Sequence, residues 1–261
     1  VQEVKRKFNF KKVGHLGTLD PLATGLLIVA VNKATKFSSY FLNEIKAYSA
    51  EVTLGKTSDT DDAEGNILNV TADLPDSKKV ILSLNSFLGE SLQKAPFYSA
   101  LKHKGKPLYK YARDGELIEK PSRKINIMDI SNICYQEPLL EFDIVCSKGT
   151  YIRSIARDIG NLLNCGGHLS KLKRTQQGCF KIKNSNLIKD LSVNHIISIE
   201  SAFPQFNSIN LDESEEKIYK NGGRVDSIRG NKEISKIYSF SNKFMGLGEI
   251  NDSGLKLKQL V

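Results

Sequence analysis

One carboxylate, that of Asp20, stands in a stretch whose backbone departs from an ordinary helix. The stretch reads Gly14-His15-Leu16-Gly17-Thr18-Leu19-Asp20-Pro21-Leu22-Ala23-Thr24-Gly25. Pro21 disfavours the helical region for the residue before it, and the glycines permit tight turns and close approach by another segment. A carboxylate on a constrained turn can act as a nucleophile or as a base in catalysis.

The residues around Asp20 also allow a simpler interpretation. An aspartate before a proline is most often a turn former, and the dipeptide alone favours that role. The apolar run at 26–31 that follows predicts a buried strand. A turn anchored to such a strand would hold the carboxylate still, so the residues alone leave both interpretations open.

A second candidate, Arg153, lies at the start of an expected helix. An apolar stripe at helical spacing predicts a helix from about Thr150, with the members Ile152, Ile155, Ala156, Ile159, Leu162 and Leu163. A cation in the first turn is disfavoured by the helix dipole unless it has an anionic partner. Because a guanidinium can bind a carboxylate through two hydrogen bonds, we expect Arg153 to pair with one.

The charge balance favours an anionic partner. The 261-residue chain has a formal net charge of +9 and a pI near 9.2. Residues 94–113 contain no acid, and aromatic side chains alternate there with cations; residues 159–189 are also free of acids. Cations bind phosphates and aromatic rings stack on unpaired bases, so both segments predict RNA binding.

The sequence contains no pattern typical of a metal site. The acidic loop at 59–64 lacks the spacing of an EF-hand, and the four cysteines form no C-x-x-C pair. We therefore expect no metal. No apolar run reaches the roughly 20 residues of a membrane span and no signal peptide opens the chain, so we expect a cytoplasmic protein without membrane contacts.

Four segments resemble the TruB family, the tRNA pseudouridine-55 synthases. Residues 14–27 meet every fixed position of its catalytic motif, G-H-x-G-x-L-D-P-x-A-T-G-x-L, and residues 146–153 match C-S-x-G-T-Y-I-R. Residues 96–102 resemble P-x-x-Y-S-A-x-K, with one residue instead of two between Pro96 and Tyr98. Residues 166–174 resemble G-A-H-x-x-x-L-R-R, with Lys173 in place of the first arginine. The family's upstream K-P-x-G-x-T-S motif is not in this sequence.

The resemblance implies an isomerase that converts the uridine at position 55 of the tRNA TΨC arm to pseudouridine. In this family the residue at Asp20 is the catalytic nucleophile or base, and the arginine at Arg153 bridges to it. The aromatic at Tyr48 stacks on the flipped-out uridine, and Asp62 corresponds to an aspartate that shares this charge network. The reaction exchanges an N1–C1′ bond for a C5–C1′ bond without redox change, so no cofactor is implied.

The remaining implied site residues surround the uridine. His15, Tyr151 and Leu172 correspond to residues of the pocket, and Lys36 corresponds to a lysine near the active site. Without the resemblance, His15 would be interpreted as a turn-stabilising residue, Leu172 as core and Lys36 as a surface lysine.

The elements that must position these residues follow from periodicity. Strict alternation predicts half-buried strands at 46–54 and 139–146. Helical spacing predicts helices over 1–9, over 34–41 and within 73–90, and residues 190–206 have a helical, connecting character. Short strands with frequent turns are expected from residue 207.

The resemblance implies an α+β pseudouridine synthase fold, with a mixed sheet flanked by helices. We expect a catalytic domain over 1–206 and a small PUA-like β-barrel that binds RNA over 207–261. The expected partner is the TΨC stem-loop of tRNA, bound by a monomer.

Two other functions remain open. The first is an RNA-binding module with this fold and no catalysis. The second is a retaining glycosidase, which needs a second carboxylate about 5 Å from the nucleophile. Asp62 could supply that carboxylate, although the basic surface fits RNA better than a neutral sugar.

Overall fold

The computed structural model describes residues 1–261, which form two compact units. Unit 1 comprises Val1–Leu16, Ile28–Tyr40 and Asn186–Val261; unit 2 comprises Gly17–Leu27 and Phe41–Ser185. The segment at 14–27 that contains Asp20 is therefore divided between the units after Leu16. The expected domain division after residue 206 falls inside unit 1 and stays a prediction.

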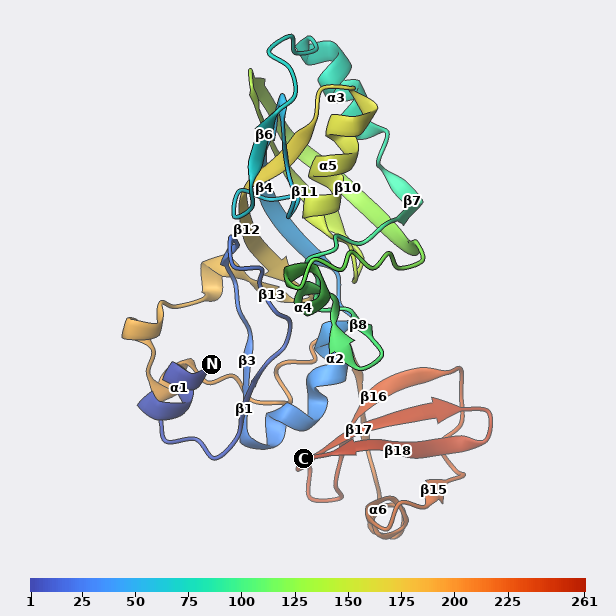
Figure 1. The fold of residues 1–261 in the computed structure, drawn as a ribbon. Helices are drawn as coiled ribbons and strands as arrows, with labels where there is room; N and C mark the ends of the chain where they lie inside the picture. Colours follow the sequence, from blue (N-terminus) through green and yellow to red (C-terminus); the bar gives the residue numbers. More distant parts are fainter. The chain divides into compact units, whose positions relative to one another are not determined.

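Unit 2 is built on a seven-stranded mixed sheet (Figure 1). Its order is β13-β12-β4-β11-β10-β7, with antiparallel neighbours, and β2 joins β12 in parallel. The expected mixed sheet is confirmed. The strands are β2 (Thr24–Gly25), β4 (Lys46–Leu54), β7 (Gly89–Gln93), β10 (Arg123–Gln136), β11 (Leu139–Cys146), β12 (Gly167–Gln177) and β13 (Phe180–Lys181).

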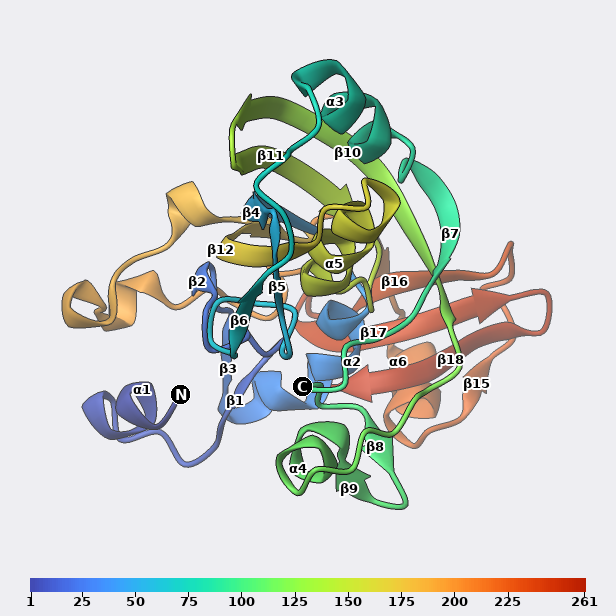
Figure 2. The same cartoon turned by 45° about the horizontal axis from the view of Figure 1, so that its top comes forward.

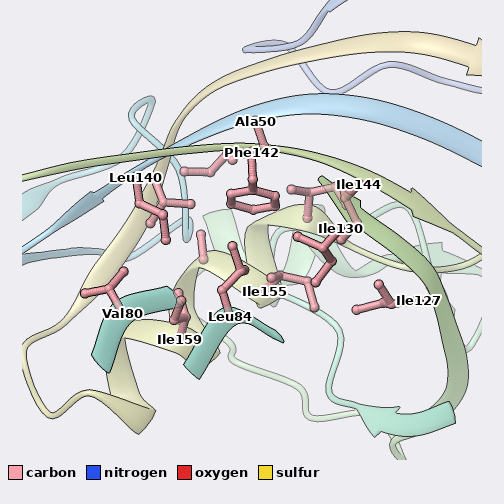
Figure 3. Packing of buried hydrophobic residues seen from close by; sticks show 14 of the residues in the cluster. Ala50, Val80, Leu84, Ile127, Ile130, Leu140, Phe142, Ile144, Ile155 and Ile159 are labelled. Atoms are coloured by element: carbon pink, nitrogen blue, oxygen red, sulfur yellow. The ribbon is translucent and has the colours of Figure 1, made fainter. Parts of the chain in front are cut away.

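Two helices, α3 (Ser77–Asn85) and α5 (Ile152–Leu162), pack on one face of this sheet. Figure 3 shows Phe142 and Ile144 pointing from the sheet toward Leu84 of α3 and Ile155 of α5. The alternation of β11 is the expected one, because Leu140, Phe142, Ile144 and Cys146 are all buried. Burying each large apolar side chain stabilises the fold by about 1.5–3 kcal/mol, and this core fixes the position of α5.

Smaller elements of unit 2 surround the sheet. The hairpin of β5 (Lys56–Ser58) and β6 (Ile67–Asn69) encloses the acidic loop. The basic segment at 94–113 contains a second hairpin, β8 (Lys102–His103) with β9 (Lys106–Pro107), and α4 (Leu108–Arg113). A short 3-10 helix, η2 (Ile182–Asn184), follows β13.

Unit 1 joins two distant parts of the chain. It contains α1 (Gln2–Lys7) and the pair β1 (Val13–His15) and β3 (Val29–Val31). The 3-10 helix η1 (Asn32–Phe37) runs into α2 (Ser38–Leu42), which crosses the boundary between units. Phe37 and Tyr40 pack on Phe203, and Lys7 of α1 donates hydrogen bonds to the Ile188 and Lys189 carbonyls.

The last part of unit 1 is a five-stranded sheet with the order β14-β16-β17-β18-β15 (Figure 2). The helix α6 (Glu213–Lys220) packs on it through Tyr219, which is fully buried and hydrogen-bonded to the Leu247 carbonyl. The edge strands β14 and β15 each pair with one neighbour, so the sheet is open and the expected barrel is not confirmed. The strands are β14 (Asn207–Asn210), β15 (Arg224–Val225), β16 (Glu233–Tyr238), β17 (Phe244–Asn251) and β18 (Gly254–Leu260).

Two expected elements differ from the structure. Only Val29–Val31 of the apolar run forms a strand, because the Leu26 N–H bonds instead to the Arg174 carbonyl on β12. Residues 190–206 form turns and a short 3-10 helix, η4 (Val193–His195), after η3 (Ile188–Asp190), rather than a continuous helix. No helix is long and apolar enough to cross a membrane.

Candidate active site

Asp20 lies on a tight turn in unit 2. The Ala23 N–H donates to the Asp20 carbonyl at 2.9 Å, which closes the turn around Pro21. Directly afterwards, β2 attaches the chain to β12, with Thr24 opposite Lys173 and Gly25 opposite Arg174. The Asp20 side chain is about one-third exposed, at 34%, so this anchored turn presents its carboxylate to solvent.

Arg153 holds that carboxylate. Its Nε donates to Oδ2 of Asp20 at 2.8 Å, and its Nη1 donates to the carbonyls of Thr60 at 3.2 Å and Tyr98 at 3.1 Å. The side chain is 5% exposed and projects from the first turn of α5, where the helix dipole favours anions nearby. The structure thus brings together two residues that are far apart in the sequence.

Asp62 completes an ion-pair group behind Asp20. Its Oδ2 lies 3.5 Å from Arg153 Nε, and its carboxylate is buried with 5% exposure. Its Oδ1 accepts hydrogen bonds from the Thr60 hydroxyl at 2.6 Å and from the Glu64 N–H at 3.1 Å. Two carboxylates therefore share one guanidinium, and only that of Asp20 reaches solvent.

A cavity of about 100 Å³ opens beside Asp20. Asp20 is its single carboxylate, and the sequence-predicted residues Tyr48, Tyr151 and Leu172 all contribute to its wall. The rest of the wall is small, apolar or hydroxyl-bearing, so the cavity suits a flat ring that needs few charged partners. Its lining is Thr18, Leu19, Asp20, Ala23, Tyr48, Thr150, Tyr151, Ile152 and Leu172.

Tyr48 presents its ring from β4 to this cavity. Burial raises the pKa of the Tyr48 phenol to about 12, although the positive charge of Arg174, which stands opposite Tyr48 in the β4–β12 pair, acts to lower it. The phenol is therefore neutral at neutral pH. It can donate a proton or a hydrogen bond but cannot act as a ready-made base.

Tyr151 is fixed by a buried glutamine on β7. Gln93 donates from Nε2 to the Tyr151 carbonyl at 3.1 Å, and its Oε1 accepts from the Tyr151 N–H at 2.8 Å. The Arg123 guanidinium lies over the Tyr151 ring, 5.5 Å from its centroid. These contacts anchor the residue that caps α5, two positions before Arg153.

His15 and Lys36, the other two predicted site residues, belong to unit 1. His15 ends β1 and Lys36 lies in η1, and both side chains are exposed. The cavity wall consists entirely of residues of unit 2, so the roles of these two residues stay predictions.

Sequence reasoning missed Arg174 and Gln93 as parts of the site. Arg174 is fully buried on β12, and its guanidinium binds backbone carbonyls of the Asp20 loop. Arg174 lies in the segment that resembles G-A-H-x-x-x-L-R-R, but the sequence indicated only that it is one of the cations in the acid-free residues 159–189. Gln93 lies in a short strand whose other residues gave no pattern, so nothing in the sequence pointed to it.

The sequence and fold match known proteins along the whole chain. A family model described as "TruB family pseudouridylate synthase (N terminal domain)" matches residues 5–152, and "tRNA pseudouridylate synthase B C-terminal domain" matches residues 153–201. A protein of Clostridium novyi (strain NT) named "tRNA pseudouridine synthase B" is 41% identical over 270 residues, covering 100% of this chain and 93% of its own. A relative of the same name from Francisella philomiragia is 41% identical and covers 99% of this chain and 88% of its own.

Among solved structures, one titled "Structure of H/ACA RNP bound to a substrate RNA containing 2'-deoxyuridine" superimposes with a TM-score of 0.73. The match is 21% identical and covers 98% of this chain and 78% of that chain, which shows a shared fold. The first family model alone spans more than half of the chain, and full-length relatives retain about 40% identity. This chain therefore belongs to the TruB family of pseudouridylate synthases.

Proposed function

We propose that this protein isomerises the uridine at position 55 of the tRNA TΨC arm to pseudouridine, with Asp20 acting on a flipped-out nucleotide. One observation carries the proposal: the only carboxylate in the cavity is held by a buried arginine at 2.8 Å. The tRNA substrate is supported by relatives named tRNA pseudouridine synthase B at about 40% identity.

The proposed reaction balances without any co-reactant. The N1–C1′ glycosidic bond breaks, the freed uracil turns within the cavity, and a C5–C1′ bond forms. A proton leaves C5 and a proton is gained at N1, so substrate and product have the same composition. The protein must therefore supply a negative group near the ribose, a closed space that retains the uracil and a route for one proton.

Asp20 supplies the negative group. The guanidinium of Arg153 binds its carboxylate and fixes the orientation of its oxygens. An ionised carboxylate can attack C1′ or C6, or remove the proton at C2′; all three begin from a uridine held beside Asp20. Asp62 supports this role indirectly, since it shares Arg153 but does not line the cavity.

The cavity wall supplies the space. A nucleotide that leaves the RNA helix loses stacking on its neighbours, and contact with an aromatic face replaces about 1–3 kcal/mol of it per base. Tyr48 offers that face, with Leu172 and Ile152 as apolar neighbours. The neutral phenol of Tyr48 can also donate a proton toward the departing base.

Positively charged side chains account for the rest of the proposed contact with tRNA. In unit 2, the acid-free segment at 94–113 places cations on a hairpin and on α4, with Tyr109 stacked against Arg113 at 5.5 Å. In unit 1, His15, Lys36 and the residues 207–261 extend the RNA contact in this proposal. The protein acts as a monomer with no metal or cofactor.

The geometry disfavours the glycosidase alternative. A retaining glycosidase needs two carboxylates at its cavity, but only Asp20 lines this one. Asp62 is buried and engaged by Thr60, Glu64 and Arg153. It has no free path to a sugar oxygen.

The test is release of tritium from a tRNA transcript labelled at C5 of uridine. The wild-type protein is expected to release tritium from the native transcript and none above background from a transcript with cytidine at position 55. Asp20→Asn should abolish release while RNA affinity persists, and Asp59→Asn, an exposed change in the same unit, should remain active. Binding without release by the wild type would instead identify an RNA-binding module, and full activity of Asp20→Asn would refute the assigned role.

A further inference from the structure

Arg174 is the largest side chain that is fully buried in this protein, with 1% exposure. Its guanidinium forms no ion pair with any carboxylate. A buried cation is costly unless hydrogen bonds satisfy its donors, and here backbone carbonyls provide them. A charge kept in such a place suggests a role that an apolar side chain would not fill.

All three carbonyls that Arg174 binds belong to the loop that carries Asp20. Nη2 donates to the Gly17 carbonyl at 3.1 Å and Nη1 to the Thr18 carbonyl at 3.4 Å, which are at the start of the loop. Nε donates to the Leu26 carbonyl at 2.9 Å, which is at its end. One rigid, planar group therefore joins both ends of the loop.

The backbone of Arg174 reinforces the same connection. Its carbonyl accepts a hydrogen bond from the Leu26 N–H at 2.8 Å, and the residue stands opposite Gly25 in the β2–β12 pair. Gly25 has φ of +98°, and a Cβ there would lie 2.4 Å from the Arg174 carbonyl oxygen. The loop thus lies directly against β12, with no room for a side chain between them.

The cavity depends on this loop. Thr18, Leu19, Asp20 and Ala23 form almost half of its wall, and all lie between the two ends that Arg174 binds. Arg174 also stands directly opposite Tyr48 in the β4–β12 pair, and its positive charge acts to lower the pKa of the Tyr48 phenol. One residue, Arg174, therefore lies against both the loop that carries the proposed nucleophile and the proposed stacking residue.

We propose that Arg174 is a positioning residue, which holds the Asp20 loop and the Tyr48 ring at the spacing that the reaction requires. The inference rests on the proposed function of Asp20. Lysine could retain the charge but presents its donors from one nitrogen, so it cannot bind both ends of the loop. A displacement of about 1 Å in a catalytic group can slow a reaction about 100-fold.

The experiment compares Arg174→Lys and Arg174→Gln with Lys78→Gln, which removes one exposed charge from α3 in the same unit. Single-turnover tritium release gives the rate of the chemical step, and filter binding gives the RNA dissociation constant. We expect the two Arg174 variants to lose about 100-fold in rate with unchanged RNA affinity, and Lys78→Gln to match the wild type. Hydrogen exchange of the peptide spanning 17–27 should quicken in the Arg174 variants alone.

A purely structural role makes a different prediction. It would lower the melting temperature and the active fraction, but the remaining folded enzyme would react at the wild-type rate and would exchange normally at 17–27. That result, or a folded Arg174→Lys variant with a rate within twofold of wild type, would overturn the proposal. Should both Arg174 variants fail to fold, Gly25→Ala tests the same contact from the loop side, and an unchanged rate there would also overturn it.

Asp20→Asn is measured in parallel. If it remains active, the proposed function of Asp20 fails and the rates of the Arg174 variants must be explained otherwise. If it is inactive while the Arg174 variants react normally, only the positioning role fails.

Discussion

Arg153 donates a hydrogen bond to Asp20 across 2.8 Å, although 133 residues separate them in the sequence. The bond connects the first turn of the core helix α5 to the turn that carries Asp20. Arg153 also donates to two backbone carbonyls, those of Thr60 and Tyr98. The orientation of the candidate nucleophile is therefore set by three separate segments of unit 2.

Arg153→Lys should lose most of the catalytic rate. Lysine keeps the positive charge, but all its donors are on one nitrogen. It therefore cannot bind Asp20 and the two carbonyls at the same time, as the Nε and Nη1 of Arg153 do. We expect the single-turnover rate of tritium release to fall about 100-fold, with little change in RNA affinity. Arg157→Lys is the matched control because Arg157, one turn further on α5, pairs with Asp61 and Asp158 and not with Asp20. Equal rates for the two variants would contradict the assigned orientation role.

Tyr48 should contribute mainly through its ring. Tyr48→Phe keeps the aromatic face and is expected to bind tRNA as tightly as the wild type, whereas Tyr48→Leu should weaken binding by about 1–3 kcal/mol. Since the pKa of the phenol is raised to about 12, its ionisation should produce no break in the rate profile below pH 10. Titrations with fluorescent tRNA measure the affinities, and Tyr135→Leu, a change on β10 outside the cavity, serves as the control. A weakened Tyr48→Phe complex would show that the hydroxyl, rather than the face, governs binding.

Much of the scaffold could be predicted from periodicity. The strands at 46–54 and 139–146 have the predicted bounds, because apolar side chains alternate along each of them. The central strand β4 also buries Glu51 on its other face. The strands β10 and β12 were not predicted. β10 has several exposed polar side chains, and β12 buries the polar residues His168, Arg174 and Gln177 where the pattern expects apolar ones. Pairing with neighbours far away in the sequence, rather than local pattern, makes them strands.

The candidate site was predictable to the extent that its residues belong to long motifs. Asp20, Tyr151 and Arg153 lie in such motifs, and the structure brings them to one cavity or to its immediate support. Gln93 and the carbonyls of Thr60 and Tyr98 could not be recognised in the sequence. Every residue has a backbone carbonyl, so its use as an acceptor does not depend on the residue type, and a single glutamine in a strand is ordinary. Their roles depend on distances between segments, which only the folded chain defines.

Asp61 should make stability depend on pH below neutrality. Burial raises the pKa of its carboxyl from 3.8 to about 6, and the Arg157 guanidinium opposes this only in part. The folded state therefore binds the proton more tightly than the unfolded chain does, and the stabilisation is fully present below about pH 4 and is lost as pH rises through about 6. The free energy of unfolding should fall over that window by about 2–3 kcal/mol relative to Asp61→Asn.

Urea denaturation at intervals between pH 4 and pH 7 measures this difference. Asp59→Asn, which changes an exposed neighbour in the same loop, should keep the pH dependence of the wild type. Parallel curves for the wild type and Asp61→Asn would show that the Asp61 carboxyl has the same proton affinity in the folded and unfolded states.

Gln93→Leu should destabilise the end of α5 that carries Arg153. Gln93 is 2% exposed, and its amide satisfies both the N–H and the carbonyl of Tyr151. Leucine has a similar size but leaves the Tyr151 N–H without a partner, at a cost of about 1–3 kcal/mol. The Tyr151 carbonyl loses one of its two donors and keeps the Ile155 N–H at 3.2 Å. We expect the free energy of unfolding to fall by at least the lower of these values, and the rate of tritium release to fall with it, because Arg153 lies two residues from the released segment.

Glu90→Gln, an exposed change on the same strand, is the control. If Gln93→Leu were as stable and as active as Glu90→Gln, the Tyr151 backbone would not need the glutamine, and the order at the start of α5 would have to come from the packing of its apolar stripe.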